Sequence, residues 1–202
     1  MTLQTIIFIG MQGAGKGTQA HLLEEYLKTT AGERSVFRFE TGAGFRKLME
    51  GNSYTAQLVK EGMKEGKLQP EFLSVWLWTN GFVEQFTGEE HIMIDGFPRS
   101  LFEAQMLHTA LNFYKRLPAT VIFLDINDII AYERLLERGR HDDKPEVIKT
   151  RLQWYRERVT PIIDFYDWRD DYRLIRVHGE RSIEEVHKEI LEKLKRFNDA
   201  SA

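Results

Sequence analysis

The chain has 202 residues, of which 42% are hydrophobic and 29% charged, and its formal net charge is -3. This balance is typical of a globular domain with a sizeable core, and it lacks the strong basic excess of a protein that covers nucleic acid. The absence of cysteine excludes disulfides and cysteine-ligated zinc. Its apolar runs are too short for a signal peptide or a membrane span, so we expect a cytoplasmic protein with neither nucleic acid nor membrane as a partner.

Five short apolar runs, separated by longer helical patterns, predict the strands. They are residues 5–9, 35–39, 91–94, 120–124 and 173–177. Three runs are nearly continuous, as in strands buried on both faces, whereas Arg38, Arg173 and Arg176 interrupt the other two. The last helical pattern follows Ser182 and Glu185, which form a plausible capping box. This alternation predicts a three-layer α/β fold with a five-stranded parallel sheet, whose ligands bind beyond the carboxyl ends of the strands.

The first run leads directly into a glycine-rich loop, residues 10–18, and then into a helical pattern. Glycines let successive N–H groups turn inward around a phosphate, and the helix N-terminus adds partial positive charge. Lys16 supplies a full charge. We therefore predict a phosphate-binding P-loop that contains Gly13, Ala14, Gly15, Lys16, Gly17 and Thr18. The alternative is a turn that only joins strand to helix.

Two features of the loop and its surroundings bear on magnesium. The generic pattern places Ser or Thr directly after the lysine, but here Gly17 intervenes before Thr18, which weakens the case for a hydroxyl ligand. Asp95 ends the third apolar run, where a carboxylate beside a P-loop commonly orients Mg²⁺ directly or through water. Mg²⁺ is therefore the expected cofactor. Alternatively, Asp95 only caps the following turn.

The loop and the segment Asp95-Gly96-Phe97-Pro98-Arg99 together resemble the adenylate kinase family of nucleoside monophosphate kinases, which has the P-loop NTPase fold. Thr41-Gly42 with Arg46, and Gly66-Lys67-Leu68, resemble further segments of that family, while Gln12 stands where the family usually has proline. The resemblance extends from Ile6 to about Gly179. It implies reversible transfer, ATP + AMP = 2 ADP, by a single domain of residues 1–202. That domain would comprise a core (1–40, 71–138 and 147–202), a helical monophosphate-binding insertion (41–70) and a short lid (139–146).

The resemblance also implies the site residues. The catalytic set is Lys16, Arg99, Arg138, Arg140 and Arg151. ATP would bind the six loop residues named above with Arg134, Arg138 and Gly179. The monophosphate would bind Thr41, Gly42, Arg46, Lys67, Leu68, Gly96, Arg99, Glu103 and Gln105. Arginine forks suit phosphate oxygens, although the arginines could instead lie on a solvated helix and pair with nearby carboxylates such as Asp142 and Asp143.

The acceptor base is less well specified. Glu103 stands four residues after Arg99, where adenylate kinases usually carry a glutamine that reads adenine. An ionised carboxylate only accepts hydrogen bonds, so it matches the paired donors of guanine better. Gln105 could read the base instead. AMP is the preferred prediction, with GMP, CMP, UMP, a deoxynucleotide, or a catalytically silent nucleotide-binding module as alternatives.

The remaining expectations are structural. Trp76, Trp78, Trp154 and Trp168 are interpreted as packing in the core or at the lid hinge, and the six histidines show no metal-ligand spacing. Relatives of this size are often monomeric, so a monomer is expected.

Overall fold

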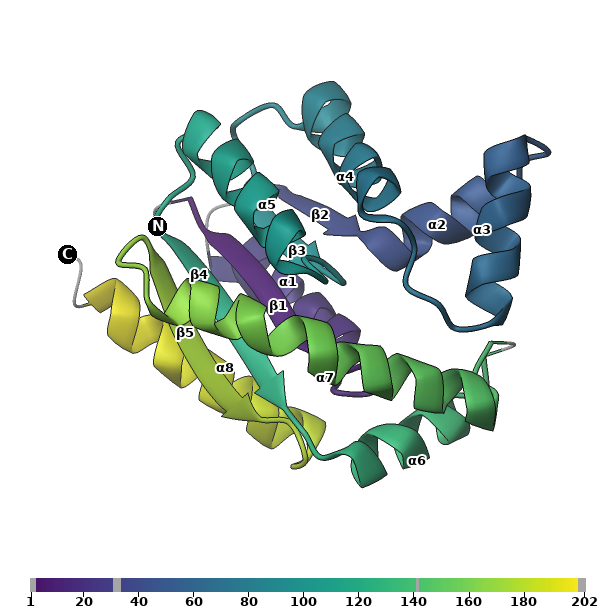
Figure 1. Cartoon of the computed structure of the whole chain (residues 1–202). Coiled ribbons are helices and arrows are strands. Elements are labelled where there is room, and N and C mark those ends of the chain that lie inside the picture. Colours follow the sequence, from purple (N-terminus) through teal and green to yellow (C-terminus); the bar gives the residue numbers. More distant parts are fainter. Residues whose placement is uncertain (1–2, 31–33, 141, 200–202) are drawn as a thin grey trace.

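The computed structural model describes residues 3–30, 34–140 and 142–199. Its five strands form one parallel sheet in the order β2-β3-β1-β4-β5 (Figure 1). They are β1 (Thr5–Gly10), β2 (Val36–Glu40), β3 (His91–Asp95), β4 (Ala119–Asp125) and β5 (Tyr172–His178). Each predicted strand is present to within a residue at either end, and the predicted fold class is confirmed.

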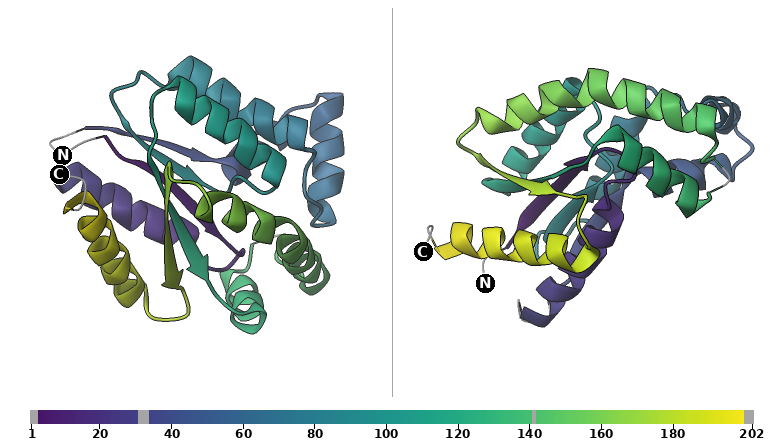
Figure 2. Two further views of the ribbon diagram at one scale, coloured as in Figure 1. Left: turned by 60° about the vertical axis from the view of Figure 1, so that its left-hand side comes forward. Right: turned by 90° about the horizontal axis from the view of Figure 1, so that it is seen from below.

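Helices cover both faces of this sheet and complete three layers, which are clearest in the right-hand view of Figure 2. One face carries α1 (Lys16–Thr30) and α8 (Ile183–Asp199); the other carries α4 (Glu71–Gln85), α5 (Leu101–Phe113) and α7 (Pro145–Asp167). The capping box at the start of α8 is confirmed, because Ser182 and Glu185 exchange hydrogen bonds of 3.1 and 3.2 Å. No helix among the described residues is both long and apolar enough to cross a bilayer.

Successive side chains of β1 point to opposite faces of the sheet, and both faces are buried, which explains why the strand is apolar throughout. Ile6 and Phe8 pack into the core shared with α1 and α8, whereas Ile7 and Ile9 pack into the core shared with α4, α5 and α7. All four side chains are buried. The two runs that contain arginines are the edge strands β2 and β5, where one side of each strand has no neighbouring strand.

The sheet order creates a crevice at its carboxyl edge. The connection after β1 leads outward to β2, while the connection after β3 leads the other way to β4. Helices α1 and α5 therefore leave on opposite faces, and a ligand can bind between the two strand ends. The glycine-rich loop follows β1 and Asp95 ends β3, so both lie at this crevice.

Two smaller parts border the crevice. Helices α2 (Thr41–Met49) and α3 (Tyr54–Lys64) fall within the predicted insertion and pack on α4 through a separate cluster of Phe45, Val59 and Leu73. Between α6 (Asp128–Arg138) and α7 lies the predicted lid, whose His141 is outside the described residues. The division into core, insertion and lid remains a prediction about how these parts move.

The tryptophans separate into buried and exposed groups. Trp78 is 1% exposed and stacks on Phe97 with ring centroids 5.5 Å apart, as the packing interpretation requires. That interpretation is wrong for Trp76 and Trp168, which are 51% and 87% exposed. Trp76 lies on the outer face of α4 and Trp168 follows the end of α7, so neither reaches a core.

Replacing the buried tryptophan should destabilise the fold. Trp78→Ala should lower the free energy of unfolding by about 3–5 kcal/mol, because it leaves a cavity among aromatic rings. Trp168→Ala should change it by less than about 0.5 kcal/mol, because that ring faces solvent. Denaturant unfolding followed by circular dichroism measures both values; equal midpoints would contradict this account of the core.

Candidate active site

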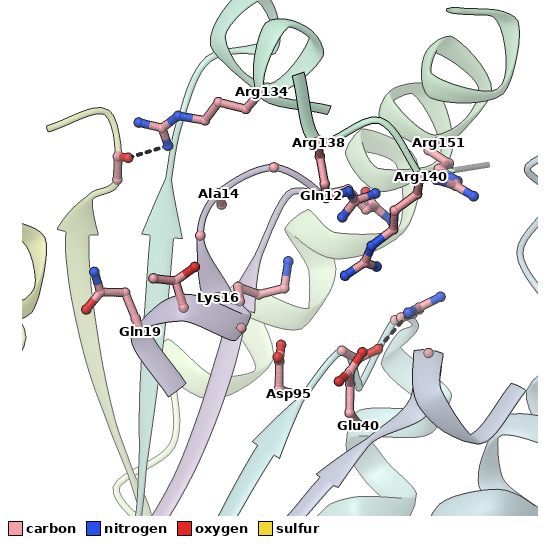
Figure 3. A pocket seen from close by; sticks show the side chains of 18 of the residues that line it. Gln12, Ala14, Lys16, Gln19, Glu40, Asp95, Arg134, Arg138, Arg140 and Arg151 are labelled. Atoms are coloured by element: carbon pink, nitrogen blue, oxygen red, sulfur yellow. Dashed lines mark hydrogen bonds between the residues drawn. The ribbon is translucent and has the colours of Figure 1, made fainter. Parts of the chain in front are cut away.

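A cleft of about 860 Å³ opens at the carboxyl edge of the sheet. That volume is at the upper end for small-molecule sites. Its walls come from the glycine-rich loop, the ends of β2 and β3, the insertion, and the segments around α6 and α7 (Figure 3). Residues far apart in the sequence therefore meet around one space.

The loop has the backbone geometry that a phosphate cradle needs. Gly13 and Gly15 have φ values of +88° and +89°, which side chains other than glycine rarely adopt. A Cβ on Gly13 would lie 2.8 Å from the carbonyl oxygen of Ala131, so the loop packs tightly against α6 there. A Cβ on Gly15 would meet nothing within 4 Å, so this part of the loop has open space beside it for a ligand.

Lys16 is held against the loop by backbone oxygens. Its ammonium donates to the carbonyls of Gly10 and Met11 at 2.6 and 2.9 Å. Burial lowers the pKa of Lys16 to about 8, with smaller effects from the charges of Asp95, Arg99 and Arg138, of which only Asp95 favours the protonated amine. A phosphate entering the cleft would replace the two carbonyls as the partner of this ammonium.

Asp95 presents a largely buried carboxylate beside the loop. It is 5% exposed, and burial raises its pKa, although the nearby charge of Lys16 partly opposes that change. Arg38 on the edge strand lies 3.8 Å from Asp95. The described residues contain no cluster of three or more His, Cys, Asp or Glu side chains that could hold a metal ion. The oxygen donors here suit Mg²⁺, which keeps several waters and is usually bound by one or two carboxylates together with substrate phosphates.

The insertion side of the cleft carries a second group of cations. The Nε of Arg99 donates to the carbonyl of Gly96 at 2.6 Å, and its guanidinium lies 5.9 Å from the ring centroid of Trp154. Arg46 pairs with Glu40 at 3.0 Å. Both guanidiniums line the same cleft as the loop, so cations from separate segments of the chain border one space.

One carboxylate organises the arginines around the predicted lid. Asp143 accepts two hydrogen bonds from Arg138, at 2.7 and 2.8 Å, and one from Arg151 at 3.2 Å. Arg151 also pairs with Asp142, and the backbone N–H of Arg140 donates to Asp143 at 3.2 Å. The suggested pairing with carboxylates therefore occurs, yet Arg138, Arg140 and Arg151 also line the cleft.

The chain after β5 closes the far side of the loop. Arg134 donates to the carbonyl of Gly179 at 2.7 Å and to that of Glu180 at 3.2 Å (Figure 3). A Cβ on Gly179 would lie 3.2 Å from the oxygen of Ala14 and 2.9 Å from the side chain of Ile126. Gly179 thus lets the chain approach the loop closely, beside a flat guanidinium.

Most of the predicted site residues meet at this cleft. The residues that line it are Gly13, Ala14, Gly15, Lys16, Gly17, Thr18, Gly42, Arg46, Lys67, Asp95, Gly96, Arg99, Arg134, Arg138, Arg140, Arg151 and Gly179. Four predicted monophosphate-binding residues do not line it: Thr41, Leu68, Glu103 and Gln105. Their roles stay predictions.

Glu103 has a different set of contacts from those of a base reader. Its carboxylate is 2% exposed and accepts from the backbone N–H of Arg99 at 2.7 Å, while its own N–H donates to the Ser100 hydroxyl at 3.2 Å. Together these two bonds cap the start of α5, with the carboxylate bonded to the N–H of the residue before the N-cap Ser100. Burial raises the pKa of Glu103. Gln105 is exposed on the same helix.

Several residues that line the cleft were not predicted. They include Gln12, Gln19, Arg38, Glu40, Phe45, Met63, Gln69 and Trp154. Arg38 gave a signal, since a charge interrupts an otherwise apolar run just before its carboxyl end. Phe45, Met63 and Gln69 gave none, because only the folding of the insertion turns them toward the cleft.

Comparison with known proteins agrees with this geometry. A family model described as adenylate kinase matches residues 8–171. Adenylate kinase 1 of Nostoc sp. is 35% identical over 185 residues, covering 92% of this chain and 95% of that protein. Adenylate kinase of Corynebacterium urealyticum is 31% identical over 186 residues, covering 92% and 96%. The residues that the family model matches include the loop, the end of β3 and the lid arginines. The chain therefore belongs to the adenylate kinase family of phosphotransferases with a phosphate group as acceptor.

Proposed function

We propose that this protein catalyses the reversible reaction ATP + AMP = 2 ADP in the cleft. One observation carries the proposal: two groups of cations, one at the glycine-rich loop and one at Arg46 and Arg99, line a single space. One group alone would suit a nucleotide-binding module. Two groups suit a donor and an acceptor that both carry phosphate.

The donor phosphates would lie in the loop. The backbone N–H groups of residues 13–18 and the N-terminus of α1 would bind them, with Lys16 on the transferring group. Arg134 beside Gly179 offers a flat guanidinium on which the adenine of ATP can stack. Arg138, Arg140 and Arg151 would contact the phosphates from the lid side.

The acceptor phosphate would lie on the opposite side, between Arg46 and Arg99. Gly42 and Gly96 would let it approach the backbone closely, and Lys67 would add charge from the insertion. Each guanidinium already has an acceptor partner, Glu40 or the carbonyl of Gly96, that phosphate oxygens can replace.

The transfer itself needs no covalent intermediate. An oxygen of the AMP phosphate attacks the γ-phosphorus of ATP in line, forming one P–O bond. The bond from that phosphorus to the bridging oxygen breaks, and its electron pair leaves with the β-phosphate of the product ADP. The cations neutralise charge on the three equatorial oxygens, which accounts for most of the catalysis in such a step.

Magnesium fits the donor side. Asp95 would hold it through water, with Thr18 nearby, although the case for direct ligation by that hydroxyl is weak because Gly17 intervenes. When bound, Mg²⁺ would supply charge neutralisation at the donor phosphates. Asp95 would keep its carboxylate oxygens beside the donor phosphates. The insertion and the lid would exclude water that could otherwise accept the phosphoryl group.

AMP remains the preferred acceptor. The buried contacts of Glu103 account for its carboxylate without a guanine partner, which removes the reason to favour GMP. Thr41 is fully buried below this side of the cleft, and its hydroxyl has no hydrogen-bond partner in the described part of the chain. The cytoplasmic location and the monomeric state stay predictions.

The loop lysine gives the most direct test. Lys16→Met should lower kcat by at least about 100-fold, because it removes a full charge from the transferring group. Lys28→Met is the matched control, since that exposed lysine on the same helix pairs with Glu24 and Glu25 away from the cleft, and it should retain full activity. A coupled assay measures both. An active Lys16→Met enzyme contradicts the mechanism, and an inactive wild type supports the silent nucleotide-binding module instead.

The pKa of Lys16 predicts a pH profile. Phosphate binding needs the protonated amine, so kcat/KM for ATP should fall by up to about tenfold per pH unit as pH rises above about 8. The profile of kcat should fall only at higher pH, because bound phosphates raise the pKa of this amine. Identical profiles for kcat and kcat/KM would contradict the assignment.

A panel of monophosphates tests the acceptor. AMP should exceed GMP, CMP and UMP in kcat/KM by at least about tenfold, because a site with fixed hydrogen-bonding groups rejects a mismatched base. Glu103→Gln should lower stability or activity for all acceptors together, without changing their order. A switch of preference in that variant would show that Glu103 reads the base after all.

A further inference from the structure

Gln12 is an unexplained polar residue in the middle of the glycine-rich loop. It lines the cleft, yet its Oε1 is buried and has no hydrogen-bond partner among the described residues. A buried oxygen without a partner costs free energy, so such groups usually mark a strained or functional position. The loop pattern itself leaves this position open, so the backbone does not require glutamine here.

Gln12 is flanked by residues that contact the groups proposed to act on the transferred phosphoryl group. Lys16 donates to the carbonyl of Met11, the residue before Gln12, at 2.9 Å. Gly13, the residue after it, packs against α6, from whose end Arg138 extends. Figure 3 shows Gln12 on the part of the loop that faces Arg138 and Arg140. Gln12 thus lies on the stretch of loop whose flanking residues contact Lys16 and the helix that ends in Arg138.

The amide has the groups that such a place can use. It carries two N–H donors and one oxygen acceptor. The donors match phosphoryl oxygens, and the oxygen matches a guanidinium N–H. A neutral amide can therefore connect an anion on one side to an arginine on the other, which neither a carboxylate nor an apolar side chain can do.

We propose that Gln12 is a further catalytic residue, which donates an amide N–H to an oxygen of the phosphoryl group in flight and accepts from a lid guanidinium. This inference rests on the proposed function. No bond of Gln12 is made or broken; its contribution is a fixed hydrogen bond where charge develops. Because the contact forms at the transferring group, it should act on kcat more than on substrate binding.

Two variants of similar length test the role. Gln12→Met removes both donors and the acceptor, and should lower kcat by about 10- to 100-fold. Removing one oxyanion-hole donor from an enzyme typically lowers kcat by about 100- to 1,000-fold, so the expected effect is at or below the lower end of that range. Gln12→Glu keeps oxygen atoms but adds negative charge, and should lower kcat further. KM for ATP and AMP should change by less than threefold with Gln12→Met. Gln85→Leu, an exposed position at the end of α4 outside the cleft, is the control and should match the wild type.

Stability distinguishes this role from a structural one. Gln12→Met removes a buried oxygen without a partner, so its Tm should stay equal or rise while kcat falls. A lower Tm with a matching loss of folded enzyme, kcat within twofold of the wild type, or an effect confined to KM would each overturn the inference. If the wild type transfers no phosphoryl group, the proposed function fails first; an active wild type with an equally active Gln12→Met enzyme rejects the inference alone.

Discussion

Positive charge concentrated around one cleft is the constraint on which the rest of this structure depends. Like charges at short range repel, and burial adds a desolvation cost. Hydrogen-bond acceptors offset this repulsion and desolvation and hold the cations in place. Backbone carbonyls accept from Lys16, Arg99 and Arg134. The carboxylate of Asp143 accepts from Arg138 and Arg151. Phosphate oxygens can replace the acceptors of Lys16, Arg99, Arg138 and Arg151, whereas Arg134 can keep its carbonyl partners. The cations of the cleft are therefore held in place before any ligand binds.

The parallel sheet is what brings these groups together. Its strand ends place the glycine-rich loop and Asp95 side by side, and its order sends the following helices to opposite faces. The predicted insertion, which has a small core of its own, contributes Arg46 and Lys67. Helices α6 and α7 and the segment between them contribute the other cations, which are Arg134, Arg138, Arg140 and Arg151. The sheet thus fixes where the loop and Asp95 lie, while the insertion has a smaller buried cluster than the sheet, which suits it to moving as a unit.

The same geometry explains which site residues local patterns could not identify. Glu103 resembled a base reader by its spacing from Arg99, but a glutamate three residues after Ser100 can equally cap a helix, and the buried carboxylate makes those contacts. Trp168 resembled a packing residue by composition, yet it follows the end of α7 and faces solvent. In both cases one sequence pattern is compatible with two environments, and only the packing selects between them.

The sequence by itself determined the α/β class, the five strands, the phosphate loop and the family, because these depend on local periodicity and on motifs whose geometry is built into adjacent residues. It also contained the arginines, a residue type suited to phosphate, and Asp95, a carboxylate suited to Mg²⁺. Tertiary structure alone decided that Asp143 is the carboxylate that holds both Arg138 and Arg151, that Arg38 reaches Asp95, and that Gln12 lines the cleft with a buried oxygen that has no partner among the described residues. The contact between Arg38 and Asp95 joins two strands far apart in the sequence, and the choice among the carboxylates near the lid depends on how the ends of α6 and α7 pack, so neither follows from a local pattern.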